Sequence, residues 1–156
     1  MEERINFYEK GYLAMKGLFS TGGYLAKSKL GQPLIDLIDF RVSQMNGCAY
    51  CLDMHAKDLR AAGESEQRLY LLSAWREAPF YTDRERAALA WAEGVTKADI
   101  PDEVYTYACE QFSEEEMIDL TMAVITINSF NRINIAFRVK AGDYQPGMHA
   151  HLLQKN

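Results

Sequence analysis

The sequence predicts an all-α fold, and three observations lead to that prediction. Apolar residues recur at spacings of three and four, which is the period of an amphipathic helix. No segment shows the sustained apolar–polar alternation of a strand. Two capping boxes, Thr82-x-x-Glu85 and Ser113-x-x-Glu116, mark helix starts, because the hydroxyl accepts a backbone N–H while the glutamate bonds back to the cap. With 156 residues, the chain is expected to form one domain.

Four helices are expected before the first capping box. Asn46-Gly47 ends the second of them, because glycine readily adopts the left-handed turn that follows a helix. Gly63 ends the third, and the fourth stops before Pro79. The expected ranges are 3–26, 34–46, 48–62 and 66–77.

Three further helices are expected in the second half of the chain. The first capping box opens a helix that runs to about Thr96, and Pro101 opens a short helix that ends near Phe112. The second capping box opens the longest helix, which runs to about Lys140. The tail 142–156 is rich in turn residues, and we expect it to lie at the periphery.

The last expected helix is apolar on nearly every face between Leu120 and Val139. A helix of that kind is buried on all sides, and a chain of this size has little interior for it. We therefore expect it to pack against a second subunit; the alternative is a central position within one subunit. Its polar residues then need partners inside or at the interface, and for Arg132 we expect a carboxylate of another subunit. These polar residues are Asn128, Asn131, Arg132 and Asn134.

Composition and charge exclude several classes of protein. Apolar residues make up 48% of the chain and aromatic residues 12%, which excludes intrinsic disorder. The net charge is −5 and no basic patch is present, so nucleic-acid binding is not expected. The sequence has no run of about 18 apolar residues and no apolar secretory signal. We therefore expect a cytoplasmic protein without a membrane span.

The chemistry is expected to reside in Cys48, Cys51 and His55, which form the pattern Cys-x-x-Cys-x-x-x-His. Spacings of three, four and seven place the three side chains on one face of a helix. The N–H groups of the first turn stabilise a thiolate, and a histidine can take the thiol proton. In such a redox cycle one thiolate is oxidised to a sulfenic acid, which condenses with the second thiol to a disulfide. Cys109 stands alone and is expected to be a small buried apolar residue.

Two other interpretations of this pattern are a structural cysteine pair and a zinc site. A cytosolic Cys-x-x-Cys is more often redox-active or metal-binding than a structural staple. Zinc lacks a fourth ligand unless His149 or His151 folds back from the tail. We therefore expect no metal, flavin or haem.

The same region resembles a known family. Residues 41–96 strongly resemble the alkylhydroperoxidase AhpD-like family of the carboxymuconolactone decarboxylase superfamily, in the sequence RVSQMNGCAYCLDMHAKDLRAAGESEQRLYLLSAWREAPFYTDRERAALAWAEGVT. Residues 127–138, INSFNRINIAFR, are similar to the last core helix of that family. The resemblance covers most of residues 30–140. It implies one AhpD-like all-α domain over 1–156 that assembles into homo-trimers or hexamers, with peroxidase activity that depends on a Cys-x-x-Cys pair, a histidine and an upstream carboxylate.

The resemblance also implies roles for the three motif residues. Carried over by position, Cys51 attacks the peroxide, Cys48 resolves the sulfenic acid, and His55 relays the proton. Reasoning from the helix terminus alone favours Cys48 as the attacking thiol. The family assignment is preferred because His55 is nearer to Cys51 in the sequence.

Two positions depart from the family pattern. Asp36 stands where the family has a glutamate twelve residues before the first cysteine, and it is shorter by one methylene. Asp39, one turn further on, is the substitute. Tyr50 stands where the best-known members carry a second histidine, which weakens the transfer of a full proton relay.

The sequence thus predicts a thiol-dependent peroxidase that reduces hydroperoxides through a Cys48–Cys51 disulfide cycle. Its electron donor is expected to be a thiol or lipoyl-type partner. One rival is a decarboxylase of a lactone acid, whose chemistry needs no vicinal dithiol. The other is a non-catalytic protein whose disulfide state alters assembly or partner binding.

Overall fold

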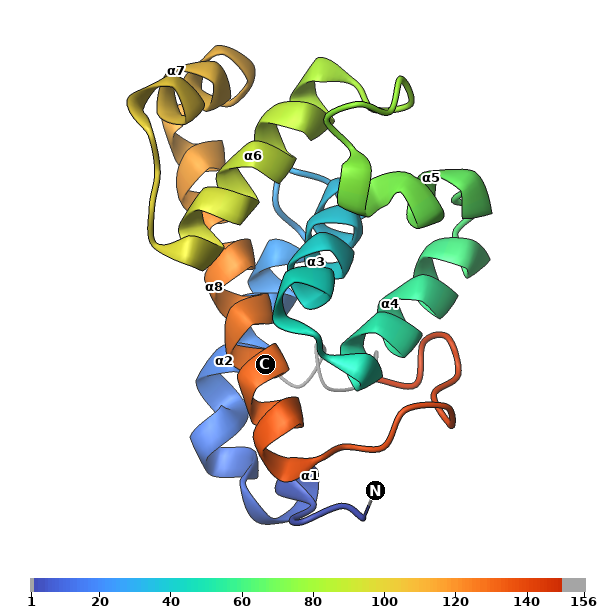
Figure 1. The fold of residues 1–156 in the computed structure, drawn as a ribbon. Helices are drawn as coiled ribbons and strands as arrows, with labels where there is room; N and C mark the ends of the chain where they lie inside the picture. The colour runs from blue at the N-terminus through green and yellow to red at the C-terminus, as the bar shows by residue number, and fades with distance from the viewer. Residues whose placement is uncertain (1, 150–156) are drawn as a thin grey trace.

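The structure is a computed structural model that describes residues 2–149. Within those residues it contains eight α-helices, one short 3₁₀ helix and no strand, so the prediction of an all-α fold is confirmed (Figure 1). The elements in chain order are α1 (Phe7–Lys10), α2 (Tyr12–Leu25), α3 (Gln32–Asn46), α4 (Ala49–Ala61), α5 (Glu66–Leu71), η1 (Leu72–Ala74), α6 (Asp83–Lys97), α7 (Asp102–Gln111) and α8 (Glu114–Phe137).

Helix α3 lies at the centre and packs against α4, α6 and α8 (Figure 1). Its apolar residues meet those of α6 and α8 in the main core, in which Ile38, Val42, Leu120 and Val124 are fully buried. Helix α2 packs on the other side of α8, and α4 packs against α3. This arrangement places the start of α4 beside α8.

The local signals in the sequence set most helix ends. Both capping boxes form as expected, at Thr82 before α6 and at Ser113 before α8. Gly47 has a φ of 67°, so it supplies the left-handed turn that separates α3 from α4. The expected first helix is instead two helices that meet at Gly11, whose backbone N–H bonds to the Phe7 carbonyl.

Polar side chains fix the end of α3 against α8. The Asn46 Nδ2 donates hydrogen bonds to the Oδ1 atoms of Asn128 and Asn131, at 3.0 and 2.9 Å. The Asn131 Nδ2 donates to the Ser43 hydroxyl at 3.0 Å. These asparagines of α8 therefore find their partners within the chain, and they hold the turn that leads into α4.

Arg132 is exposed in the single chain, where its Nη1 donates to the carbonyl and Oδ1 of Asn128, so its expected carboxylate partner in another subunit stays a prediction. Two other expectations are wrong for the described chain. Cys109 is exposed, because α7 packs through the neighbouring Ala108. The tail up to residue 149 is not peripheral, since Tyr144 is 3% exposed and packs against α4. The expectation that α8 contacts a second subunit stays a prediction.

No helix among residues 2–149 combines the length and the apolar character that a membrane span requires.

Candidate active site

The two cysteines of the motif lie at the start of α4. Cys48 is the N-cap residue, and its Sγ accepts a hydrogen bond from the backbone N–H of Cys51 at 3.3 Å. The turn at Gly47 sets this geometry, because it ends α3 and leaves Cys48 in extended backbone before the helix begins. Both sulfurs therefore lie in the first turn, where the N–H groups of the helix favour a thiolate.

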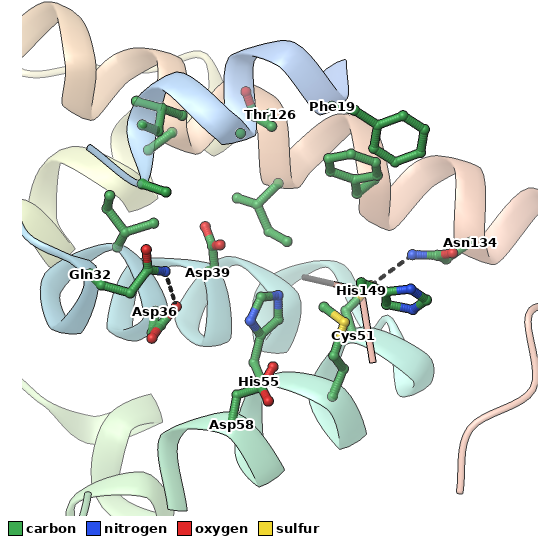
Figure 2. A pocket seen from close by; sticks show the side chains of 18 of the residues that line it. Phe19, Gln32, Asp36, Asp39, Cys51, His55, Asp58, Thr126, Asn134 and His149 are labelled. Atoms are coloured by element: carbon green, nitrogen blue, oxygen red, sulfur yellow. Dashed lines mark hydrogen bonds between the residues drawn. The ribbon is translucent and has the colours of Figure 1, made fainter. Parts of the chain in front are cut away.

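Cys48 and Cys51 form a disulfide, with their Cα atoms 5.3 Å apart. Both residues are buried, at 1% and 0% exposure, but only Cys51 lines a cavity. The Cys51 Sγ accepts a hydrogen bond from the Asn134 Nδ2 at 3.3 Å (Figure 2). Cys51 is thus the sulfur that a small molecule in the cavity would meet.

The cavity has a volume of about 480 Å³ and lies between α2, α3, α4, α8 and the tail. One wall is apolar, and the opposite side carries carboxyl groups and the ring of His55 (Figure 2). Its described lining includes no lysine and no arginine. The apolar wall is made by Phe19, Leu25, Ile35, Ala123, Ile127 and Phe130.

His55 projects from α4 into this cavity (Figure 2). Its ring is buried, and its Nε2 has no hydrogen-bond partner among the described residues. Burial lowers the pKa of His55 to about 4, because the charged imidazolium loses its hydration there. At neutral pH the ring is therefore an uncharged base with a free nitrogen in the cavity.

Asp36 and Asp39 reach the same cavity from α3 (Figure 2). The Asp36 Oδ1 accepts a 2.7 Å hydrogen bond from the Gln32 Nε2, and the His55 Nε2 makes no hydrogen bond to Asp36 or to another described residue. Burial raises the pKa of Asp36 to about 6. The hydrogen bond from Gln32 lowers this pKa, and the charge of Asp58 raises it, but both effects are smaller than that of burial. Burial also raises the pKa of Asp39 well above its usual range, and the charge of Asp36 adds to that shift.

The tail closes one side of the cavity, and we call residues 140–149 the C-terminal strap. The Lys57 Nζ donates to the carbonyls of Gly142 and Tyr144, both at 3.0 Å. The Gly142 N–H donates to Asp53 at 2.9 Å, and the Tyr144 hydroxyl donates to Asp58 at 2.8 Å. Charged residues of α4 thus hold the strap against the site.

Two tyrosines and a histidine complete the rim of the cavity. Tyr50 is buried beside the cysteine pair, and its hydroxyl lies 2.5 Å from the Nε2 of His149. The ring of Tyr8, from α1, stacks on the ring of His149. Among residues 2–149, no group of His, Cys, Asp and Glu is arranged to hold a metal ion. Of the two tail histidines weighed as zinc ligands, His149 meets Tyr50, and His151 lies outside the described residues.

Comparison with known proteins assigns the chain to a family. Residues 13–94, just over half of the chain, match the carboxymuconolactone decarboxylase family. The chain belongs to this family. The uncharacterized protein YdfG of Bacillus subtilis is 42% identical over 144 residues, which are 90% of this chain and 98% of that protein.

Two further similarities show that this family member is AhpD-like. The crystal structure of a protein of unknown function from Agrobacterium tumefaciens, described as a putative antioxidant defence protein AhpD, matches with a TM-score of 0.86 and 40% identity, over 92% of this chain and 100% of that chain. The alkyl hydroperoxide reductase AhpD of Azorhizobium caulinodans is 38% identical over 69 residues, which are 40% of this chain and 38% of that protein. The resemblance to the AhpD-like family inferred from the sequence is therefore confirmed.

The AhpD-like site brings together the residues that the motif predicted and adds others. Cys51, His55, Asp36 and Asp39 line one cavity, while Cys48 lies behind Cys51. Helix spacing revealed the motif residues, because their separation in the chain is short. Asn134, Tyr8 and His149 lie far from the motif in sequence, and only the packing of α8, α1 and the strap brings them to it.

Proposed function

We propose that this AhpD-like protein is a thiol-dependent peroxidase that reduces hydroperoxides through the Cys48–Cys51 pair. One observation carries the proposal: Cys51 lines the cavity beside a free basic nitrogen of His55, and Cys48 lies directly behind it within disulfide reach. A dithiol arranged in this way has one sulfur for a substrate and one for resolution. The family match and the similarity to an alkyl hydroperoxide reductase also support this chemistry.

Each step of the cycle uses a group in the cavity. His55 takes the Cys51 thiol proton, and the thiolate attacks the terminal oxygen of the hydroperoxide. The S–O bond forms as the O–O bond breaks, and the remaining alkoxide takes a proton and leaves as an alcohol. The Cys48 sulfur then displaces the sulfenic oxygen as water, and the disulfide forms. A thiol or lipoyl-type dithiol reduces it, and no cofactor takes part.

A carboxylate is assigned to orient His55, and two residues of α3 offer one. Asp36 holds the family position and would have to exchange its hydrogen bond with Gln32 for one with the imidazole. Asp39 also faces the cavity, and burial raises the pKa of its carboxyl group well above the usual range. We assign the role to Asp36, with Asp39 as the second position to test.

The apolar wall and the absence of basic groups from the described lining argue against the lyase alternative. A lactone acid carries carboxylates, which need positively charged or donor groups in a buried site. The carboxyl groups of Asp36 and Asp39 would repel such a substrate when they are ionised. An uncharged hydroperoxide faces no such penalty.

Turnover of an organic hydroperoxide tests the proposal. The protein is mixed with dihydrolipoamide and tert-butyl hydroperoxide, and loss of the peroxide is followed. The wild type and the control Cys109→Ser should consume many equivalents per chain. Cys51→Ser should consume none above the background with dihydrolipoamide alone. Without dihydrolipoamide, Cys48→Ser should react once and stop at a Cys51 sulfenic acid, with no intramolecular disulfide.

Two outcomes would contradict the peroxidase assignment. A single stoichiometric oxidation of the wild type, not reversed by thiols or dihydrolipoamide, would favour a redox-responsive protein. Turnover that survives in Cys51→Ser would remove the cysteine pair from the mechanism.

A further inference from the structure

A second histidine reaches the dithiol site from the other end of the chain. His149 lines the same cavity as Cys51 and His55, and its ring lies toward the Cys51 end in the view of Figure 2. Its Nε2 is 2.5 Å from the hydroxyl oxygen of Tyr50, the residue that precedes Cys51. This contact places an imidazole beside the residue that precedes Cys51.

The position of His149 is built by several contacts. Its ring stacks on Tyr8 with centroids 5.1 Å apart and planes 16° apart, and the Tyr144 ring lies 5.6 Å away. Tyr144 is itself fixed by its hydrogen bond to Asp58. The imidazole is therefore held in one orientation toward Tyr50.

Tyr50 is suited to donate a proton. Burial raises the pKa of its hydroxyl, and the charges of Asp53 and Asp58 raise it further, while a hydrogen bond with Tyr8 opposes them. The hydroxyl therefore keeps its proton at neutral pH. In the tautomer with a proton on Nε2, His149 donates to the Tyr50 oxygen, and the Tyr50 O–H can turn into the cavity.

His55 is uncharged in the resting site and carries a proton only after it has taken one from Cys51. Its pKa of about 4 means that only about one ring in a thousand carries a proton at pH 7. His55 can accept the thiol proton, whereas the leaving alkoxide is a strong base and needs an acid. The Tyr50 hydroxyl is a second proton donor at the cavity, on a group that does not take the thiol proton.

We propose that His149 is a positioning residue of the dithiol site, which aligns and reprotonates Tyr50 so that the Tyr50 hydroxyl protonates the oxygen that leaves the peroxide. This inference rests on the proposed function. As the Cys51 sulfur takes the terminal oxygen, the O–O bond breaks and the alkoxide takes the Tyr50 proton. His149 returns a proton to Tyr50, and the imidazole recovers its own from water.

The test compares two oxidants that differ in their leaving group. Reduced protein is mixed once with tert-butyl hydroperoxide, which releases a strongly basic alkoxide, or with peracetic acid, which releases a weakly basic carboxylate. The rate of Cys48–Cys51 disulfide formation is measured without any turnover. In His149→Gln and Tyr50→Phe, oxidation by the alkyl hydroperoxide should slow about 10–100-fold, while oxidation by the peracid changes little.

Further variants separate proton donation from support of the strap. His149→Phe keeps a ring against Tyr8 and should show the same selective loss as His149→Gln. Gln145→Ala, an exposed strap residue, is the matched control and should react with both oxidants like the wild type. The double variant Tyr50→Phe/His149→Gln should be no slower than Tyr50→Phe alone, because His149 acts through Tyr50 and both changes interrupt the same proton transfer.

The outcomes are distinct for the two proposals. Equal slowing with both oxidants in His149→Gln, or no slowing with either, would overturn the role of His149 and leave the peroxidase proposal intact. A wild type that reacts with the alkyl hydroperoxide no faster than a free dithiol would overturn both.

Discussion

Burial, rather than a hydrogen-bonded partner, sets the protonation of His55. The ring is 7% exposed, its Nε2 has no partner among the described residues, and loss of hydration lowers its pKa from 6.5 to about 4. Asp36 shifts in the opposite direction for the same reason, because burial also disfavours a charged carboxylate. The site therefore carries less charge at neutral pH than its residue types suggest.

Replacement of His55 should change the pH dependence of stability. The unfolded state binds a proton at His55 below about pH 6.5 and the folded state only below about pH 4, so the wild type loses stability as the pH falls through this window. Relative to His55→Gln, the wild type should lose about 3 kcal/mol more between pH 7 and pH 4. Urea unfolding of the oxidised proteins across this range measures the difference. Parallel curves for the two proteins would show that His55 is solvated.

Asn134 should control the reactivity of Cys51 at little cost in stability. Its Nδ2 donates to the Cys51 Sγ, while its buried Oδ1 has no partner among the described residues. Asn134→Leu removes a donor to the thiolate, which should raise the Cys51 thiol pKa by about one unit and slow alkylation about tenfold at pH 7. It also removes an unsatisfied buried oxygen, so the unfolding free energy should stay within about 1 kcal/mol.

Alkylation by iodoacetamide in a Cys109→Ser background, mapped by mass, reports on this prediction. Urea unfolding of the same protein provides the control for folding. If the alkylation rate of Cys51 is unchanged, Asn134 does not stabilise the thiolate.

At the level of helices and loops, signals that act within a few residues were predictive. The left-handed Gly47 sets the end of α3, and the capping boxes at Thr82 and Ser113 set the starts of α6 and α8. These three boundaries therefore follow from the sequence. The break at Gly11 and the 3₁₀ turn after α5 were not predicted. Neither has a local signal comparable to a capping box.

The strap shows why the remainder of the site could not be predicted. Gly142 and Tyr144 look like ordinary loop residues, and their partners Asp53 and Asp58 are more than 80 positions away. Spacing within one helix identifies Cys48, Cys51 and His55, because it fixes their relative directions. Contacts between distant segments depend on the packed fold, and one sequence carries no equivalent signal for them.

Tyr144→Phe should loosen the strap at one end. The change removes the 2.8 Å hydrogen bond to Asp58 and the 3.1 Å acceptor for the Gly147 N–H. Local opening should become easier by about 1–3 kcal/mol, because Asp58 is left without its hydroxyl donor. Hydrogen exchange at the Gly147 amide should therefore accelerate, while the Gly142 amide, held by Asp53, changes less. Equal acceleration at both amides would indicate that the strap opens as one unit.

At the scale of the whole molecule, the helix that supports the site also carries an uncovered surface. The inner face of α8 supplies Asn134 to the cysteines and apolar residues to the core and the cavity. Its outer face exposes Ile118, Met122 and Ile125, which lie four and three residues apart and so form one stripe. Contiguous exposed apolar side chains of this kind mark contact surfaces.

We expect this stripe to be the contact between copies of the chain in a homo-trimer or hexamer. Ile118 is 65% exposed and Ile125 is 44% exposed in the single chain, so association would remove substantial apolar area from water.

Ile125→Asp places a charge in that contact, and such a buried charge without a partner is strongly unfavourable. Light scattering at micromolar concentration should give three or six times the chain mass for the wild type and one chain mass for Ile125→Asp. Leu13→Asp, at an 85% exposed position on α2, is the control and should assemble like the wild type. A wild type that scatters as a single chain would contradict the assignment of α8 as an interface, and loss of assembly in Leu13→Asp instead would move the contact to α2.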